Sequence, residues 1–221
     1  MNTEMPLRNK RIAIDARPLS MPHTGVALYL KSVIRALCEK GAQITLISNA
    51  PLVSPDDLLI NCDLIVGLGT NRFIWEQITL LRILNRNKFD IYFCGWNYGL
   101  PALYRGKTKL ILSVLDLIPL NYPSVYLQRF TDRIAYKTSL QISVRKASKL
   151  LTISQASADD FTQHFPSYKI EPIHIKMLSV DPSSKSPYPG DYFCYLGGVD
   201  HRKNIDKLLD GFAKYHELNA A

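Results

Sequence analysis

The 221-residue sequence lacks most of the signatures that identify common enzyme classes or cellular destinations. Its four cysteines are far apart and form no Cys-x-x-Cys pair, which argues against a zinc ribbon or a disulfide framework and favours a reducing, cytoplasmic setting. No signal peptide is readable at the N-terminus, and the most apolar stretches, 58–69 and 110–120, are too short to span a bilayer. A Walker loop, a Gly-x-Ser-x-Gly elbow, a His-Glu-x-x-His motif and an Asp-x-Asp metal pair are also missing.

The composition is that of a globular, basic protein. Hydrophobic residues make up 47% of the chain, which is too many for a disordered segment. The 27 Lys and Arg outnumber the 19 Asp and Glu and give a formal net charge of +8, which suggests an anionic partner such as a phosphate, a nucleic acid or a membrane surface. No nucleic-acid-binding motif accompanies this charge, so we expect no nucleic-acid partner.

Short apolar runs alternate with helical periodicity along most of the chain. The runs predict strands at 11–15, 43–48, 63–66, 90–94, 109–114, 149–153 and 173–178. The periodic segments predict helices at 26–40, 72–86, 125–146 and, after an N-cap at Ser154, up to His164. Because the strands are continuous rather than alternating, they favour a Rossmann-like α/β fold, with a parallel sheet covered by helices on both faces.

The texture of the chain changes after residue 180. Residues 181–191 are rich in Pro and Ser and predict a linker. A strand at 192–196 and a helix at 205–218 then predict one further βα unit. We therefore expect a first domain at 8–180, a linker at 181–191, and the start of a second, incomplete Rossmann-like domain at 192–221.

Polar residues follow several of the predicted strands. In an open parallel sheet, ligands bind outside the carboxyl ends of the strands. The residues expected at that edge are Asp15, Arg17, Asn97, Asp116 and Ser154. Each also fits a simple turn or cap, most clearly Ser154. Gly25 opens the first helix, whose N-terminal backbone N–H groups suit a phosphate.

Two groups of cations are candidate anion sites. Gly197-Gly198 followed by Arg202-Lys203 fits a diphosphate clamp just before a helix, although a solvated basic turn has the same composition. Arg129, Arg133 and Lys137 share one face of the long predicted helix. That pattern is typical of a solvated face, and also of a surface that meets a membrane or an acidic substrate.

Five segments in order resemble glycosyltransferase family 4, whose members have the GT-B fold. They are Ile14-Asp15-Ala16-Arg17-Pro18-Leu19 with Thr24-Gly25-Val26, then Trp75-Glu76-Gln77, Asp116-Leu117-Ile118-Pro119-Leu120, Thr152-Ile153-Ser154, and Gly197-Gly198 with Arg202-Lys203-Asn204-Ile205. The resemblance implies that the first domain holds a glycan or lipid-linked acceptor and the second a nucleotide-sugar donor. It also implies transfer with retention and without a metal or other cofactor, in cell-surface polysaccharide biosynthesis at the inner face of the membrane.

The resemblance also suggests roles for individual residues and leaves two readings open. Asp116 is the expected catalytic residue, while Arg202 and Lys203 bind the donor diphosphate. The family usually has a histidine where this chain has Leu115, and its Glu-x7-Glu motif lies beyond Ala221. We therefore expect this chain alone to be inactive as a catalyst. The second reading is a non-catalytic relative that binds a glycan or a partner. The residues leave the donor sugar and the acceptor open.

Overall fold

The computed structural model describes residues 7–21, 24–52, 61–173, 192–195, 197–198 and 203–219. The chain divides into two compact units, Met1–Ser179 and Val180–Ala221. Each unit is described by itself below. The expected linker at 181–191 lies outside the described residues, so that domain boundary stays a prediction.

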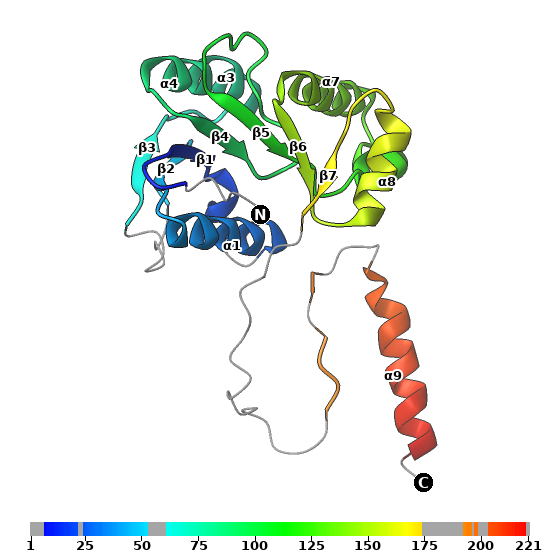
Figure 1. Ribbon diagram of the computed structural model, residues 1–221. Coiled ribbons are helices and arrows are strands. Elements are labelled where there is room, and N and C mark those ends of the chain that lie inside the picture. The colour runs from blue at the N-terminus through cyan, green and yellow to red at the C-terminus, as the bar shows by residue number, and fades with distance from the viewer. Residues whose placement is uncertain are drawn as a thin grey trace, which may run out of the picture. The chain divides into compact units, whose positions relative to one another are not determined.

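The described part of the first unit contains a seven-stranded, fully parallel sheet in the order β3-β2-β1-β4-β5-β6-β7 (Figure 1). The strands are β1 (Arg11–Asp15), β2 (Gln43–Ser48), β3 (Asp63–Val66), β4 (Ile91–Cys94), β5 (Lys109–Ser113), β6 (Lys149–Thr152) and β7 (Glu171–Pro172). The expectation of a parallel, Rossmann-like sheet is confirmed. The last strand was expected at 173–178, but β7 ends at Pro172 and Ile173 is not part of a strand; residues 174–178 lie outside the described residues.

Helices cover both faces of this sheet. They are η1 (Arg17–Ser20), α1 (Gly25–Glu39), α3 (Arg72–Ile74), the π-helical turn η2 (Trp75–Thr79), α4 (Leu80–Arg86), α5 (Ile118–Asn121), α6 (Pro123–Tyr126), α7 (Phe130–Lys146) and α8 (Gln155–His164). Figure 1 shows α1 on one face and α3, α4 and α7 on the other. The predicted helical cover on both faces is therefore confirmed.

Two apolar cores follow from the alternation of side chains along the strands. In β1, Ile12 and Ile14 point to the core that contains Leu30 and Ile34 of α1. Ala13 points to the opposite core, which contains Leu140 of α7. Both cores are buried. Because the paired strands run parallel, their carboxyl ends lie at one edge of the sheet.

The long helix begins later than the sequence predicts. A helix was expected from residue 125, but Leu127 and Arg129 have ψ angles of 62° and 139°, which end α6 and separate it from α7. Val125 fits the helical period of the segment that follows, so a prediction from periodicity alone merges α6 and α7 into one helix.

The second unit contains α9 (Ile205–Asn219), which confirms the predicted helix. The expected strand at 192–196 is not formed by its described residues, 192–195, which have no regular secondary structure. Phe193 packs edge-on against Phe212 and Tyr215 of α9, with ring centroids 5.6 and 5.2 Å away. Among the described helices of both units, none has the length and hydropathy needed to cross a bilayer.

Candidate functional site

The candidate site lies where the order of the sheet reverses. From β1 the chain adds β2 and then β3 on one side, and β4 then pairs with the other side of β1. Parallel sheets of this kind bind ligands at such a switch point, outside the carboxyl ends of the strands. The residues that follow β1, β4 and β5 therefore define the site.

A buried ion pair occupies the end of β1. Arg17 donates from Nη2 to Asp15 Oδ2 at 2.7 Å and from Nε to Asp15 Oδ1 at 3.0 Å. Asp15 is 0% exposed and Arg17 6%. Burial on its own would raise the pKa of the Asp15 carboxyl, but the charge and hydrogen bonds of Arg17 and a bond from Trp96 outweigh it and lower that pKa.

The ion pair extends into a chain of four alternating charges. Arg17 Nη1 donates to Glu76 Oε1 at 3.0 Å, and Arg72 Nε donates to the same oxygen at 2.8 Å. Glu76 lies in η2, where the wider π-helical turn sits within an otherwise α-helical segment. Such turns are frequent at functional sites. The order Asp15–Arg17–Glu76–Arg72 links the end of β1 to the helix that precedes β4.

Aromatic rings from the loop after β4 cover these charges. Trp96 Nε1 donates to Asp15 Oδ2 at 3.0 Å, and the Arg17 guanidinium lies 4.9 Å from the Trp96 ring centroid. The Arg72 guanidinium lies 3.7 Å from the centroid of Tyr98 and donates to its hydroxyl. Trp96 and Tyr98 are stacked, with an interplanar angle of 8°. The charge chain therefore sets the position of this loop.

The same loop holds the end of β5. Asn97 Oδ1 accepts hydrogen bonds from the backbone N–H groups of Leu115 and Asp116, at 2.8 and 3.4 Å. Asp116 Oδ1 in turn accepts from the backbone of Ile118, at the start of α5, at 3.2 Å. Asn97 and Asp116 are both half-buried. The structure therefore brings these two expected site residues into direct contact, as it does Asp15 and Arg17.

Tyr136 of α7 completes this polar edge. Its ring packs edge-on against Tyr98, with centroids 5.1 Å apart. Burial, with the nearby Tyr98 and Asp116, raises the pKa of the Tyr136 hydroxyl above its usual value. The phenol therefore stays neutral at physiological pH and can donate a hydrogen bond.

Other expected site residues have structural roles. Asp15 and Arg17 were expected to line the edge, but both side chains are buried beneath it. Their ion pair makes this burial possible, because a buried charge needs a partner of opposite charge. Ser154 Oγ accepts a hydrogen bond from Ser157 N at 3.1 Å and caps α8, so the interpretation of Ser154 as a helix cap is confirmed. Gly25 is exposed at the first position of α1, where Thr24 is the cap.

Leu115 stands where the resemblance seen in the sequence predicts a histidine. It is 8% exposed and packs in the core that α1 forms with β1 and β2. Its backbone carbonyl accepts from Ser157 Oγ at 2.8 Å. A leucine side chain offers a ligand no hydrogen bond, so the polar contacts at this edge come from Asn97 and Asp116.

The second unit carries part of the predicted diphosphate clamp. Gly197, Gly198 and Lys203 are exposed, and Tyr195 donates its hydroxyl hydrogen to Gly198 O at 2.8 Å. Arg202 lies outside the described residues. Whether these residues bind phosphate stays a prediction.

Sequence reasoning missed Glu76 and Arg72 as parts of the site. Both stand in the helix expected at 72–86, where Glu76 was noted only as part of the Trp75-Glu76-Gln77 resemblance and given no role in the site. Two signals were present: a Glu among apolar residues, and an Arg four residues before it, which is the spacing of a helical ion pair. Arg17, the other partner of Glu76, is 59 residues away, so that contact has no local signal.

The fold and the site together define a Rossmann-like α/β domain with a polar edge at its switch point. A model of glycosyltransferase family 4 matches residues 23–178, well over half of the chain. The chain therefore belongs to glycosyltransferase family 4.

Solved structures give more distant similarities. One is the glycotransferase of kitacinnamycin, 16% identical over 87% of this chain and 56% of that chain, with a TM-score of 0.40. Another is the epimerase Mth375 from Methanothermobacter thermautotrophicus, 11% identical over 67% of this chain and 36% of that chain, with a TM-score of 0.28. The chain thus spans little more than half the length of the first. No curated protein matches this chain.

Proposed function

We propose that this chain forms the acceptor side of a glycosyltransferase that uses a nucleotide-sugar donor. It acts with retention on a glycan or lipid-linked acceptor in cell-surface polysaccharide biosynthesis, at the cytoplasmic face of the membrane. The observation that supports this most strongly is the contact between Asn97 and the Asp116 loop, at the switch-point edge of a family 4 domain.

Asp116 is the proposed catalytic residue. Its Oδ1 accepts from the backbone of Ile118, and no described residue donates to its Oδ2. A half-exposed carboxylate in this state accepts a hydrogen bond from a sugar hydroxyl and stabilises positive charge that develops at the transferred carbon. Asn97 holds the Asp116 backbone in place through its side-chain oxygen. The Asn97 amide therefore lies at the same edge as the Asp116 carboxylate.

The donor diphosphate is proposed to bind Gly197, Gly198, Arg202 and Lys203. Glycines allow the backbone to approach a phosphate closely, and the two cations neutralise the charge that builds on the departing diphosphate. With that charge neutralised by side chains, the proposed reaction uses no metal ion.

Peripheral contact with a membrane is part of the proposal. Arg129, Arg133 and Lys137 are exposed along α7 and its N-terminal end. A lipid-linked acceptor would present its sugar at the membrane surface, so a basic face beside the acceptor domain fits that substrate.

The alternative is a non-catalytic relative that binds a glycan or a partner protein. The buried Leu115 favours it, because the side chain usually expected there is a histidine that contacts the sugar. A glycan-binding relative predicts acceptor binding without transfer, a partner-binding relative predicts neither, and only the transferase predicts transfer.

Release of nucleoside diphosphate from a panel of sugar nucleotides, in the presence of oligosaccharide acceptors, separates the two functions. The chain is assayed joined to a complete donor domain. Acceptor-dependent release that Lys203→Ala abolishes, with unchanged thermal unfolding, supports the transferase. Acceptor binding without release from any donor supports the binding protein.

A further inference from the structure

Two of the four cysteines come together at the amino end of the sheet, although 24 positions separate them in the sequence. Cys38 lies in the last turn of α1, and Cys62 comes directly before β3. In the turn that follows α1, Gly41 N donates to Cys38 O at 2.9 Å, and Ala42 N donates to Leu37 O at 3.1 Å. This tight turn keeps Cys38 next to the start of β2.

The strand register brings Cys62 to the same place. Asp63 of β3 lies opposite Thr45 of β2, so Cys62 lies beside Ile44. Ile44 points into the core that α1 covers, and Cys38 and Cys62 both pack, partly buried, against this core. The end of a helix and the start of a strand therefore present two thiols to each other.

The two thiols are in hydrogen-bond contact and are not joined by a disulfide. Burial, followed by the charge of Cys38 and the hydrogen bond with it, raises the pKa of Cys62 to about 12. Cys62 therefore keeps its proton at neutral pH and donates it to Cys38. Both side chains are half-buried rather than enclosed, so a small oxidant can reach them.

We propose that Cys38 and Cys62 form a reversible redox modification site, whose oxidant is a low-molecular-weight disulfide such as oxidised glutathione. The Cys38 thiolate attacks one sulfur of the oxidant, forms a mixed disulfide and releases one glutathione. The Cys62 thiolate then attacks Cys38 Sγ, closes the protein disulfide and releases the second glutathione. Two electrons pass from the protein to the oxidant, and the two protons of the protein thiols end on the two glutathione thiols.

The contact between the thiols prepares both steps. The thiolate is the attacking form of a cysteine, and the hydrogen bond from Cys62 stabilises that form of Cys38. Once Cys38 is in the mixed disulfide, its charge no longer raises the pKa of Cys62, so Cys62 loses its proton more easily when it has to attack. The sulfur atoms already touch, so small side-chain rotations bring them to the disulfide bond length of about 2 Å.

Oxidation would fasten an edge of the sheet. Among the described strands, β3 is the edge strand and pairs only with β2, and its Leu64 is 45% exposed. A disulfide ties this strand to α1 at the amino end of the sheet, opposite the edge that carries Asn97 and Asp116. In a reducing compartment the pair stays as thiols and closes when disulfide oxidants accumulate, as in redox-sensing proteins.

Oxidation of the full chain in buffers of reduced and oxidised glutathione tests the proposal, with acid quenching, alkylation and peptide mass spectrometry as the readout. We expect a Cys38–Cys62 disulfide that dithiothreitol reverses, and Cys194→Ser should form it as readily. A disulfide that fits the folded chain forms more readily there than in the unfolded chain, and stabilises the folded state by the same factor. That factor should be about tenfold or more relative to the chain in urea, and the melting temperature should rise by about 3 °C or more.

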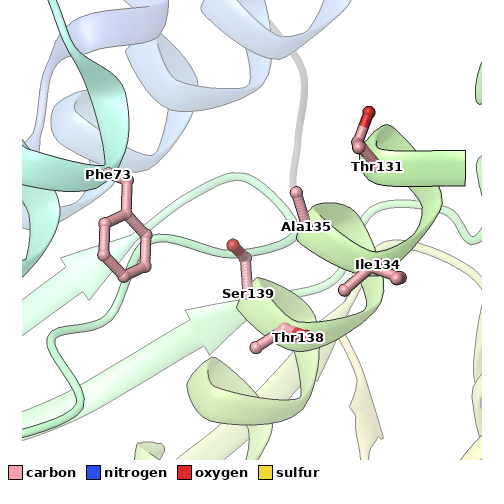
Figure 2. Close-up of a pocket in the computed structure, with 6 residues that line it drawn as sticks. All are labelled: Phe73, Thr131, Ile134, Ala135, Thr138 and Ser139. Carbon is pink, nitrogen blue, oxygen red and sulfur yellow. The ribbon is translucent and has the colours of Figure 1, made fainter. Parts of the chain in front are cut away.

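Lone thiols are the controls. Cys38→Ala and Cys62→Ala each leave one thiol of the pair, which should stop at the mixed disulfide with glutathione and give no rise in melting temperature. Ser139→Cys adds a thiol at a position that is half-buried, as Cys38 and Cys62 are. Figure 2 shows Ser139 on the side of α7 that faces Phe73, at a pocket of about 380 Å³ that no cysteine lines. The added thiol should take up glutathione and form no protein disulfide.

Hydrogen exchange locates the effect of oxidation. Exchange of the β3 amides should slow when the disulfide closes, and exchange in β5 and β6 should not change. The proposal is overturned if the unchanged chain stops at mixed disulfides, if Cys38 and Cys62 pair no more readily in the folded chain than in urea, or if the oxidised chain melts at a lower temperature. A disulfide between two chains through Cys194, as the only one formed, also overturns it. No sugar is present in these experiments, so each of these failures leaves the proposed function untouched.

Discussion

Arg17 Nη1 donates to Glu76 Oε1 at 3.0 Å in the interior, and this contact joins the end of β1 to the π-helical turn 59 residues later. Glu76 accepts from Arg72 at the same oxygen, so one carboxylate holds two guanidinium groups. The loop after β4 packs on both cations. The Arg17–Glu76 ion pair therefore stabilises the loop after β4, which forms part of the candidate site.

Glu76→Gln is expected to lower the free energy of unfolding by about 1.5–3 kcal/mol, because it removes the negative charge that Arg17 and Arg72 share, while Asp15 still pairs with Arg17. Urea denaturation measures the loss. The matched control is Glu39→Gln at the exposed end of α1, which should change stability by less than about 0.5 kcal/mol. Equal stabilities for the two variants would contradict the buried charge chain.

Stability should depend on pH through Asp15. Its pKa is lowered in the folded state, so the stabilisation is present in full above the ordinary carboxyl pKa of about 4 and is lost as the pH falls through the folded value. The stability difference between the unchanged chain and Asp15→Asn should therefore shrink from pH 7 to pH 3. The other carboxyl groups are present in both proteins, so their pH-dependent contributions cancel in this difference. A difference that stays constant over this range refutes the ion pair.

Gly99 should not tolerate a side chain. Its φ is +135°, and an added Cβ would lie 2.9 Å from Arg17 Nη2 and 3.2 Å from Glu76 Oε1. Gly99→Ala is expected to cost at least about 1–3 kcal/mol in unfolding free energy, from backbone strain and displacement of the ion pairs. Gly25→Ala is the control, since open space surrounds its Cβ position. Similar melting temperatures for the two variants would count against this packing.

The thiols should differ widely in their rates of alkylation. Cys194 is exposed. Burial, followed by the neighbouring Cys38, raises the pKa of Cys62 to about 12. Burial, followed by the charge of Asp15, raises the pKa of Cys94 well above its usual value. Mass spectrometry after iodoacetamide treatment at pH 8 should show Cys194 modified first, Cys62 slowly, and Cys94 only after unfolding. Early modification of Cys94 would contradict its burial.

The strands could be predicted from the sequence because their information is local. Continuous apolar runs set β1, β2 and β3 at the bounds that the structure shows, and the helix at 72–86 is present with its π-helical turn. The shared edge of Asn97 and Asp116 followed from the rule that parallel strands end on one side of a sheet. Long-range contacts have no such local pattern. For that reason the burial of Asp15 and the role of Glu76 were visible only in the structure.

The central claim is that the Asn97–Asp116 edge binds the acceptor. It is tested most directly by saturation-transfer NMR with a panel of soluble oligosaccharides and short-chain prenyl-linked sugars. A charge-assisted hydrogen bond contributes about 1.5–3 kcal/mol to binding. Asp116→Asn should therefore raise the dissociation constant of a bound acceptor about tenfold or more, with unchanged thermal unfolding. Asp63→Asn, at the opposite end of the strands in β3, should leave the affinity unchanged. An acceptor that binds Asp116→Asn and the unchanged chain equally would contradict the account.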